Sequence, residues 1–270
     1  MPAASDTGDT GDIALAHLVW APLGVEMLAG FLDAYRGVDA GVEHRLIAIF
    51  NGFSATADDA LADARGQLGG LEHDALVLER PVPDLAAYRA AALATEARVI
   101  CFLNSYSRPL ADGWLAALVA PLSNSGVGLT GASGSRESAL SAAPLWLRPA
   151  RIRDFPPFPN PHVRSNGFAI ERRLLLDLDW RVTRSKASAW ALESGRRSIT
   201  RQVLERGLQP VVVGRDAVAY DESQWRESAT FRAGEQANLL IEDNRTRQYA
   251  DADPQFRGTL ERLAWGSAES

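Results

Sequence analysis

Short apolar runs alternate with segments of helical pattern through the first half of this chain, and this alternation limits the possible folds more than any other feature. The apolar runs expected to form strands cover residues 13–20, 44–50, 75–78, 98–103 and 126–135. Helical patterns lie between them, at residues 26–36, 56–68 and 85–95, with a further helix start at 111–114. Parallel strands need crossover connections of this length, so the pattern predicts an α/β fold with a doubly wound, mostly parallel sheet.

The run from Arg98 to Leu103 ends abruptly in the polar stretch Asn104-Ser105-Tyr106-Ser107. A buried parallel strand typically delivers its carboxyl end to a ligand site in this way. The other strand ends are also followed by Gly, Pro, Asn, Ser or Asp, which favour turns. We therefore expect a ligand site at the edge of the sheet where Asn104 lies.

The second half of the chain is less regular. Four prolines between Asp154 and His162 predict a loop, and a short strand is expected at 168–170. One helix is expected from Glu193, an acid at its start, to the C-capping Gly207, followed by a strand at 211–213. No repeat or linker is evident, so residues 13–270 are expected to form a single domain with halves 13–135 and 136–270, and the polar residues 1–12 a disordered tail.

Composition narrows the classes of function. With 46% hydrophobic and 23% charged residues, the chain has the composition of a typical globular protein. Its formal net charge of -6 argues against nucleic-acid binding. The chain has one cysteine, Cys101, so it has no internal disulfide framework. Because Cys101 lies in an apolar run, we expect a buried thiol in a reducing compartment. No signal-peptide pattern and no apolar run of the roughly 20 residues that a membrane span needs is present. We expect a cytoplasmic protein, with contact at the inner face of a membrane left open.

The order of these segments resembles family two of the GT-A type glycosyltransferases over roughly residues 13–221. Pro22-Leu23-Gly24 stands where the family lines the nucleotide base, and Asn51-Gly52 where it often has Asp-Asp-Gly. Asp84 to Arg89 resembles a helix start of the donor side, and Ser165 to Arg173 an acceptor-side segment. Glu193 matches the start of the closing Glu-Asp pattern, although Ser194 replaces the Asp. No single motif is specific, and the order and spacing carry the resemblance.

The resemblance implies a GT-A-like domain whose first half binds a nucleotide-diphosphate sugar. The sugar would pass, with inversion, to a glycan or lipid-linked acceptor of a cell-surface polysaccharide or glycolipid pathway, and Glu193 would be the general base. The residues implied for donor binding are Pro22, Leu23, Gly24, Asn51, Gly52, Asp84, Arg89, Asn104, Ser105 and Ser107. On the acceptor side the candidates are His162, Asn166 and Trp190.

The sequence departs from the family at both of its metal positions. Asn104 to Ser107 replaces the Asp-x-Asp, and Tyr220 replaces a late His. We therefore expect no bound metal and no other cofactor, with guanidinium and backbone N–H groups neutralising the leaving pyrophosphate. The candidates for this role are Arg108, Arg164, Arg196, Arg197 and Arg201.

Other interpretations of these residues stay open. Glu193 could simply be an acid at a helix start, Asp84 a helix cap, Asn104 and its neighbours a turn, and the arginines a solvated surface. The chain could also be a catalytically inactive sugar-nucleotide-binding or assembly module of such a pathway. A nucleotide-dependent oxidoreductase ranks lower, because no Gly-x-Gly-x-x-Gly follows the first strand.

Overall fold

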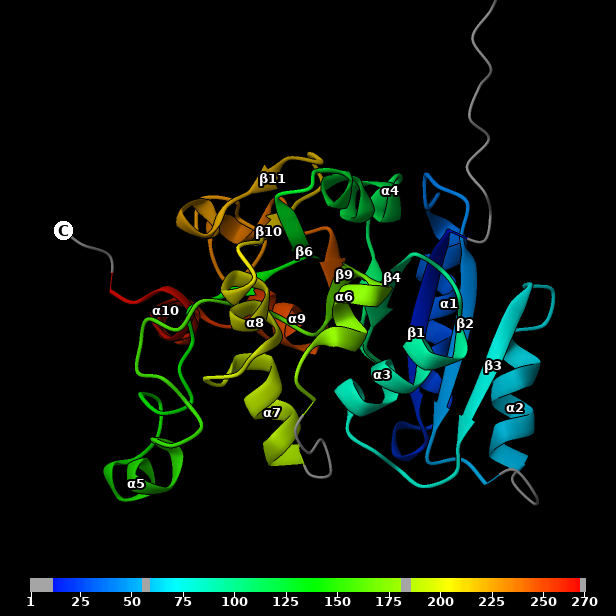
Figure 1. Cartoon of the computed structure of the whole chain (residues 1–270), viewed down its shortest axis with the longest axis horizontal. Coiled ribbons are helices and arrows are strands. Elements are labelled where there is room, and N and C mark those ends of the chain that lie inside the picture. Colours follow the sequence, from blue (N-terminus) through cyan, green and yellow to red (C-terminus); the bar gives the residue numbers. More distant parts are fainter. Residues whose placement is uncertain (1–11, 55–58, 181–185, 268–270) are drawn as a thin grey trace, which may run out of the picture.

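The computed structural model describes residues 12–54, 59–180 and 186–267 and is built around one eight-stranded sheet (Figure 1). In chain order its strands are β1 (Ile13–Trp20), β2 (Arg45–Asn51), β3 (His73–Leu78), β4 (Val99–Leu103), β6 (Val127–Gly131), β9 (Gly167–Glu171), β10 (Gln209–Val213) and β11 (Ala219–Tyr220). Across the sheet the order is β11-β10-β6-β9-β4-β1-β2-β3.

Most neighbouring strands of the sheet run parallel, as predicted. The pairs β1–β2, β2–β3, β1–β4 and β6–β10 are parallel, whereas β9 runs antiparallel between β4 and β6, and β11 antiparallel to β10. The order β3-β2-β1-β4 reverses between β1 and β4, and ligands bind at such a switch point in open α/β sheets. Residues 1–11 of the predicted N-terminal tail lie outside the described residues. Thr56, the predicted start of the second helix, also lies outside them.

Helices cover both faces of the sheet. One face carries α1 (Glu26–Gly37), α2 (Asp59–Gln67) and α4 (Trp114–Val119). The other carries α3 (Asp84–Ala94), α6 (Arg172–Asp177), α7 (Lys186–Ser194) and α8 (Ile199–Glu205). Side chains of a strand alternate between the faces, so Ala16 and Leu18 of β1 join one apolar core while Leu15 and Val19 join the other.

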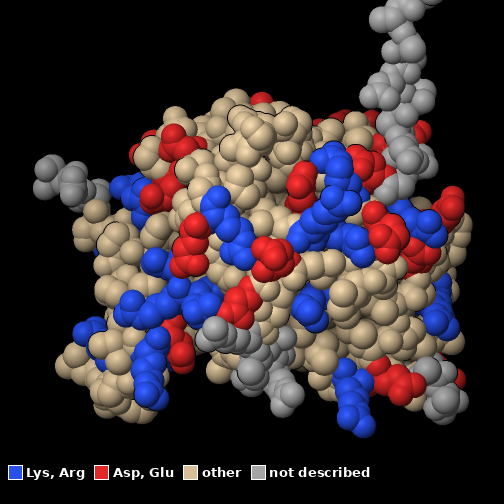
Figure 2. Space-filling model, in the orientation of Figure 1, with Lys and Arg blue, Asp and Glu red and all other residues tan. Residues whose placement is uncertain are grey.

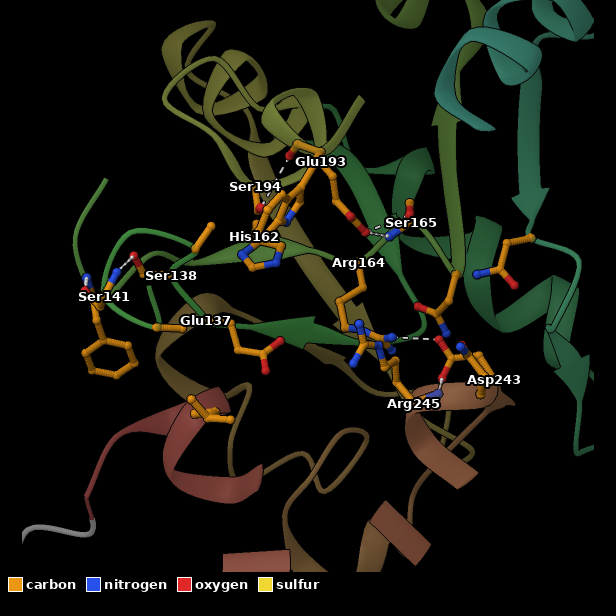
Figure 3. A pocket seen from close by; sticks show the side chains of 18 of the residues that line it. Glu137, Ser138, Ser141, His162, Arg164, Ser165, Glu193, Ser194, Asp243 and Arg245 are labelled. Carbon is orange, nitrogen blue, oxygen red and sulfur yellow. Dashed lines mark hydrogen bonds and ion pairs between the residues drawn. The ribbon is translucent and has the colours of Figure 1, made fainter. Parts of the chain in front are cut away.

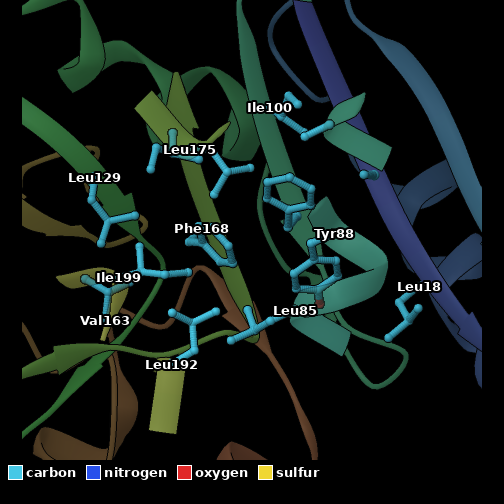
Figure 4. Close-up of a cluster of buried hydrophobic side chains, with 14 of the residues drawn as sticks. Leu18, Leu85, Tyr88, Ile100, Leu129, Val163, Phe168, Leu175, Leu192 and Ile199 are labelled. Atoms are coloured by element: carbon cyan, nitrogen blue, oxygen red, sulfur yellow. The ribbon is translucent and has the colours of Figure 1, made fainter. Parts of the chain in front are cut away.

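Three aromatic rings in mutual contact lie between α3, β4 and the antiparallel strand β9, in the apolar core of Figure 4. The ring of Phe102 in β4 lies 4.7 Å from Tyr88 of α3 and 5.1 Å from Phe168 of β9, measured between centroids. Aromatic pairs of this kind contribute about 0.5–1.5 kcal/mol each beyond their burial. The pairing places Gly167 opposite Leu103, so the start of β9 lies next to the carboxyl end of β4.

The prediction of a single helix from Glu193 to Gly207 was wrong, because two helices lie in this region. Glu193 lies in the last turn of α7, and the chain turns at Gly195. A Cβ at Gly195 would lie 2.7 Å from the carbonyl oxygen of Asp154 and closer still to that of Ala191 in α7, so these two close approaches require glycine. Ser198 then caps α8, its hydroxyl accepting a hydrogen bond from the backbone N–H of Arg201.

Smaller elements bring distant segments to the carboxyl end of β4. They are β5 (Arg108–Pro109), which pairs with β12 (Ile241–Glu242), and β7 (Gly134–Ser135), which pairs with β8 (His162–Val163). The chain after β12 forms α9 (Asn244–Ala250) and α10 (Pro254–Trp265). Among the described residues no helix combines the length and the apolar character needed to cross a membrane.

Candidate active site

A cavity of about 470 Å³ lies beyond the carboxyl end of β4 (Figure 3). Its walls come from the end of β4, the connection from β8 to β9, the end of α7, the start of α9 and the loop 137–142. Predicted site residues from both halves of the chain line it: Asn104, His162, Arg164, Asn166, Trp190 and Glu193. The three acceptor-side candidates and the proposed base therefore share one cavity with a donor-side candidate.

Glu193 is held in the cavity wall by Ser165, which belongs to the β8–β9 connection. The backbone N–H of Ser165 donates to Oε1 of Glu193 at 2.8 Å, and its hydroxyl donates to the same atom at 2.7 Å. Oε2 has no hydrogen-bond partner among the described residues. The carboxylate is thus oriented through one oxygen, and the other can accept a proton in the cavity.

His162 offers a second basic atom to the same cavity. Its Nδ1 lies 2.8 Å from the carbonyl oxygen of Asn160. A carbonyl can only accept, so Nδ1 carries the hydrogen and Nε2 of the neutral ring is an acceptor. Burial lowers the pKa of His162, while the nearby Glu193 carboxylate opposes that shift, and the ring is neutral near pH 7.

Asn104 and its neighbours build the turn at the end of β4. Oδ1 of Asn104 accepts from the backbone N–H of Tyr106 at 2.8 Å and from the hydroxyl of Ser107 at 2.9 Å. The hydroxyl of Ser105 donates to the carbonyl of Leu18 in β1 at 2.8 Å. These contacts join β4 to β1 at the switch point, and most of the polar atoms in the stretch are already engaged.

Asn166 presents a buried donor beside this turn. Its Oδ1 accepts from the hydroxyl of Ser133 at 2.8 Å, and its backbone carbonyl contacts the hydroxyl of Ser107. Its Nδ2 is buried and has no hydrogen-bond partner among the described residues. Leaving such a group unpaired costs roughly 1–3 kcal/mol, so a ligand oxygen at this position would be favoured.

A buried ion pair forms the floor of the cavity. A guanidinium nitrogen of Arg164 lies 2.6 Å from Oδ2 of Asp243, and the guanidinium lies 4.1 Å from the centre of the Phe231 ring. Oδ1 of Asp243 caps α9 by accepting from the backbone N–H groups of Arg245 and Thr246. Burial alone would raise the pKa of Asp243, but the charge of Arg164 and these hydrogen bonds outweigh it and hold the pKa below its ordinary value.

Sequence reasoning missed most of the charged groups that surround the cavity. Arg232 is buried, donates to Glu137 at 2.5 Å and lies over the same Phe231 ring at 4.9 Å. Arg245 and Arg262 line the cavity from the C-terminal segment. The spacing of Asp243 and Thr246 is a helix-capping signal that could have indicated an ordered element there.

Of the five arginines predicted to bind phosphate, only Arg164 lines the cavity. The other four have partners elsewhere: Arg108 pairs with Glu242 at 3.8 Å, Arg197 with Asp179 at 2.5 Å, Arg196 donates to the Ile152 carbonyl at 3.2 Å, and Arg201 to Asn160 at 3.1 Å. The described structure does not bring them together as a group.

The remaining donor candidates lie outside this cavity. Pro22, Leu23 and Gly24 follow β1 in a 3-10 turn (Ala21–Leu23) and just beyond it. The carboxamide of Asn51 makes two hydrogen bonds to the backbone of Val82, and Gly52 donates to the Leu78 carbonyl at 2.7 Å. The ends of β1, β2 and β3 thus meet at one edge of the sheet.

Two further donor candidates belong to α3. Asp84 is its first residue and accepts from the N–H of Leu85 at 3.1 Å. The guanidinium of Arg89 lies 5.9 Å from the centre of the Trp180 ring, and its Nε is buried without a partner among the described residues. Their donor-binding role stays a prediction.

Solved structures with a similar arrangement include those of two enzymes. One is glucosyl-3-phosphoglycerate synthase from Mycobacterium tuberculosis, in complex with Mn²⁺, UDP and phosphoglyceric acid: it is 19% identical, the match covers 62% of this chain and 57% of that chain, and the TM-score is 0.38. The other is a mannosyltransferase from Pyrobaculum calidifontis, in complex with GDP-Man and Mn²⁺: it is 13% identical, the match covers 96% of this chain and 72% of that chain, and the TM-score is 0.48.

At such identities the likeness extends to the fold and no further. This chain spans little more than half the length of the synthase in that match. No protein-family model and no curated protein sequence matches the chain. The mostly parallel sheet with helices on both faces is a doubly wound α/β fold, as predicted.

The prediction of a site without metal is corrected by these comparisons. Both solved structures contain Mn²⁺ together with a nucleotide or nucleotide sugar, and the prediction of a metal-free site disagrees with this finding. In residues 12–54, 59–180 and 186–267 no three His, Cys, Asp or Glu side chains gather as metal ligands, and the end of β4 carries amide and hydroxyl oxygens. Because the described residues do not form a carboxylate site, we derive no step through a metal ion.

Proposed function

We propose that this chain is a glycosyltransferase that moves a sugar from a nucleotide-diphosphate sugar to a hydroxyl group of a glycan or lipid-linked acceptor. The observation that carries the proposal is the orientation of Glu193 by Ser165 in a cavity at the carboxyl end of β4. The switch point between β1 and β4, where nucleotides bind in folds of this class, adjoins the same cavity.

The transfer needs a base for the acceptor hydroxyl. In the proposed reaction the hydroxyl gives its proton to Oε2 of Glu193 while its oxygen bonds to the anomeric carbon. The bond from that carbon to the diphosphate oxygen breaks, and the nucleoside diphosphate leaves with the electron pair. One displacement inverts the anomeric configuration. A base positioned within hydrogen-bond reach contributes about 10²–10⁴-fold to such a step.

Other cavity residues suit a sugar and an anionic donor. Trp190 lines the cavity and is 40% exposed, and an aromatic side chain of this kind suits contact with a sugar ring. Nδ2 of Asn166 and Nε2 of His162 provide a donor and an acceptor for hydroxyl groups. Arg245 and Arg262 add positive charge to the cavity wall, which favours a negatively charged ligand.

One observation favours a second candidate function, that of an inactive sugar-nucleotide-binding module. Oδ1 of Asn104 accepts from Tyr106 and Ser107, so it forms the turn at the end of β4, where an enzyme of the family that the sequence resembles would hold the metal that assists the departing diphosphate. Glu193 favours the enzyme, because a binding module does not need an oriented carboxylate in the cavity.

A screen of nucleotide sugars separates these functions. UDP-, GDP- and TDP-sugars would each be added with Mn²⁺, and in parallel with EDTA, while the melting temperature of the protein is measured. A ligand that binds only the folded state raises the melting temperature. Stabilisation together with sugar transfer or donor hydrolysis supports the enzyme. Stabilisation without turnover in either condition supports the binding module, and no stabilisation by any nucleotide sugar contradicts both.

A further inference from the structure

Residues 144–153, here called the Trp146 arm, expose large apolar side chains to solvent. Leu145 is 76% exposed, Trp146 77% and Ile152 55%. The first two lie in a 3-10 turn (Leu145–Leu147) that continues into α5 (Arg148–Arg151), and Ile152 follows directly. Scattered apolar residues are normal on a protein surface, but three within eight residues on one projecting element indicate an interaction surface.

The same arm is locally basic, although the whole chain is acidic. Residues 138–153 contain the three arginines Arg148, Arg151 and Arg153 and no Asp or Glu, and Asp154 follows. Arg148 and Arg151 donate to neutral backbone carbonyls of the preceding loop. Within the described part of the chain no ion pair joins these three arginines to a carboxylate. Their charges are therefore available, and Figure 2 shows blue atoms gathered in the region of α5 at the lower left.

Side-chain packing at the base of the Trp146 arm holds it in a fixed position on the molecule. Phe155 packs with Ala139, Leu140 and Ala191 of α7 in a small separate core. The ring of Phe155 lies 4.9 Å from that of Trp190, and the guanidinium of Arg151 lies 5.0 Å from the centre of the Trp190 ring. These contacts hold α5 away from the sheet, where it stands out at one end of the molecule (Figure 1).

We infer that the Trp146 arm docks on the surface of an anionic lipid bilayer. Trp and Leu insert at the boundary between headgroups and acyl chains, while arginines beside them contact anionic headgroups. The charge of the arm favours an anionic membrane as its partner over another protein. The chain as a whole carries a net charge of -6, so an anionic bilayer attracts it only where basic side chains gather without carboxylates, as they do on this arm.

Docking in this way would bring the cavity close to the membrane. The loop at the base of the arm supplies Ser138, Ser141 and Ala142 to the cavity wall, and Phe158 follows on its other side. If the proposed transfer is correct, an acceptor attached to a lipid could reach Glu193 while its anchor stays in the bilayer. This consequence rests on the proposed function, whereas the docking itself does not.

Vesicle flotation tests the docking without any assay of activity. The whole chain would be mixed with vesicles of phosphatidylcholine alone, or of phosphatidylcholine with phosphatidylglycerol, at low and high salt. We expect flotation with the anionic vesicles only, weakened by salt. The double substitution Leu145→Ser/Trp146→Ser should weaken binding by at least about tenfold, and Arg153→Glu by about fivefold or more.

The matched control is Leu93→Ser, a substitution in α3 of a side chain that is 56% exposed and lies outside the arm. It should bind vesicles like the parent protein, and a melting curve of each variant shows that it is folded. Equal binding by the Leu145→Ser/Trp146→Ser variant and the parent would overturn the inference. Failure of the parent protein to bind anionic vesicles would also overturn it. Self-association through the arm, seen by light scattering in place of vesicle binding, would do the same.

Discussion

Both hydrogen-bond donors of Ser165 are directed at one carboxylate oxygen of Glu193, at 2.8 Å from the backbone nitrogen and 2.7 Å from the hydroxyl. Ser165 lies just before β9 and Glu193 in the last turn of α7, so the contact joins the sheet to a helix that covers it. A carboxylate held through Oε1 keeps a defined direction for Oε2, which a general base needs.

The substitution Glu193→Gln should abolish most of the proposed activity while leaving the fold intact. The amide keeps the size of the side chain and still accepts from Ser165 through its oxygen, but it cannot take a proton. We expect kcat to fall by about 10²–10⁴-fold, with the donor's effect on the melting temperature retained. Glu205→Gln, in an exposed residue at the end of α8, is the matched control. Turnover by Glu193→Gln at the parent rate would show that another group is the base.

Ser165→Ala tests whether Ser165 positions the base. The substitution removes one hydrogen bond to a charged group and keeps the backbone one, so we expect kcat to fall by about 10- to 100-fold with little change in KM. Ser165→Thr retains a hydroxyl and should recover most of the rate. A change in KM alone, or a Thr variant as slow as the Ala variant, would argue for a structural role.

Asp243→Asn tests the buried ion pair. The amide can still cap α9, but it leaves the charge of Arg164 buried without its partner. We expect the free energy of unfolding to fall by about 3–5 kcal/mol in urea titrations at neutral pH. In the parent protein this contribution is present above the ordinary pKa of Asp and is lost as the pH falls through the lowered pKa of the folded state.

Asp251→Asn, an exposed residue at the other end of α9, should cost little and serves as the control. A double-mutant cycle with Arg164→Met isolates the interaction between the two charges. If Asp243→Asn costs no more than Asp251→Asn, the pair does not stabilise the fold in this way.

His17 should make the protein sensitive to mild acid. It is buried in β1, stacks on Phe31 with ring centroids 3.7 Å apart, and neither ring nitrogen has a partner among the described residues. Burial lowers its pKa from 6.5 to about 3. Between these values the unfolded chain binds a proton that the folded chain does not, so stability falls with falling pH, by up to about 1.4 kcal/mol per pH unit.

His17→Phe keeps the stacked ring and removes this titration. The free energy of unfolding of the variant, measured in urea between pH 7 and pH 4, should therefore depend less steeply on pH than that of the parent. His73→Phe, in a half-buried residue at the start of β3, is the comparison variant. Parallel pH profiles for His17→Phe and the parent would contradict the interpretation.

Much of the fold could be predicted from the spacing of apolar residues. The runs at 13–20, 44–50, 75–78 and 98–103 correspond to β1, β2, β3 and β4 within two residues at each end. Strands of a parallel sheet are buried on both faces, so nearly all of their residues are apolar, and the local sequence shows such a run directly. The break of the predicted long helix at Gly195 escaped this reasoning, because part of the crowding there comes from Asp154 in another segment, whose approach the local sequence does not show.

The candidate site could be predicted only in part. Glu193 was selected from its place in the family pattern, and His162 and Asn166 because they flank the proline-rich loop, and the structure places all three in one cavity. The arginines were not assigned correctly as a group, because an arginine shows its charge in the sequence but not its partner. Arg197 is bound to Asp179, whereas Arg245 and Arg262 reach the cavity from a segment that carried no family pattern.

The sequence by itself determined which segments of the first half become strands and helices and that polar residues follow the buried strands, since periodicity and turn chemistry are properties of neighbouring residues. Only the tertiary structure decided the antiparallel direction of β9, the pairing of Arg164 with Asp243 and the two bonds from Ser165 to Glu193. Each of these joins residues that are far apart in the chain, and its free energy depends on burial and distance, which exist only once the elements have packed together.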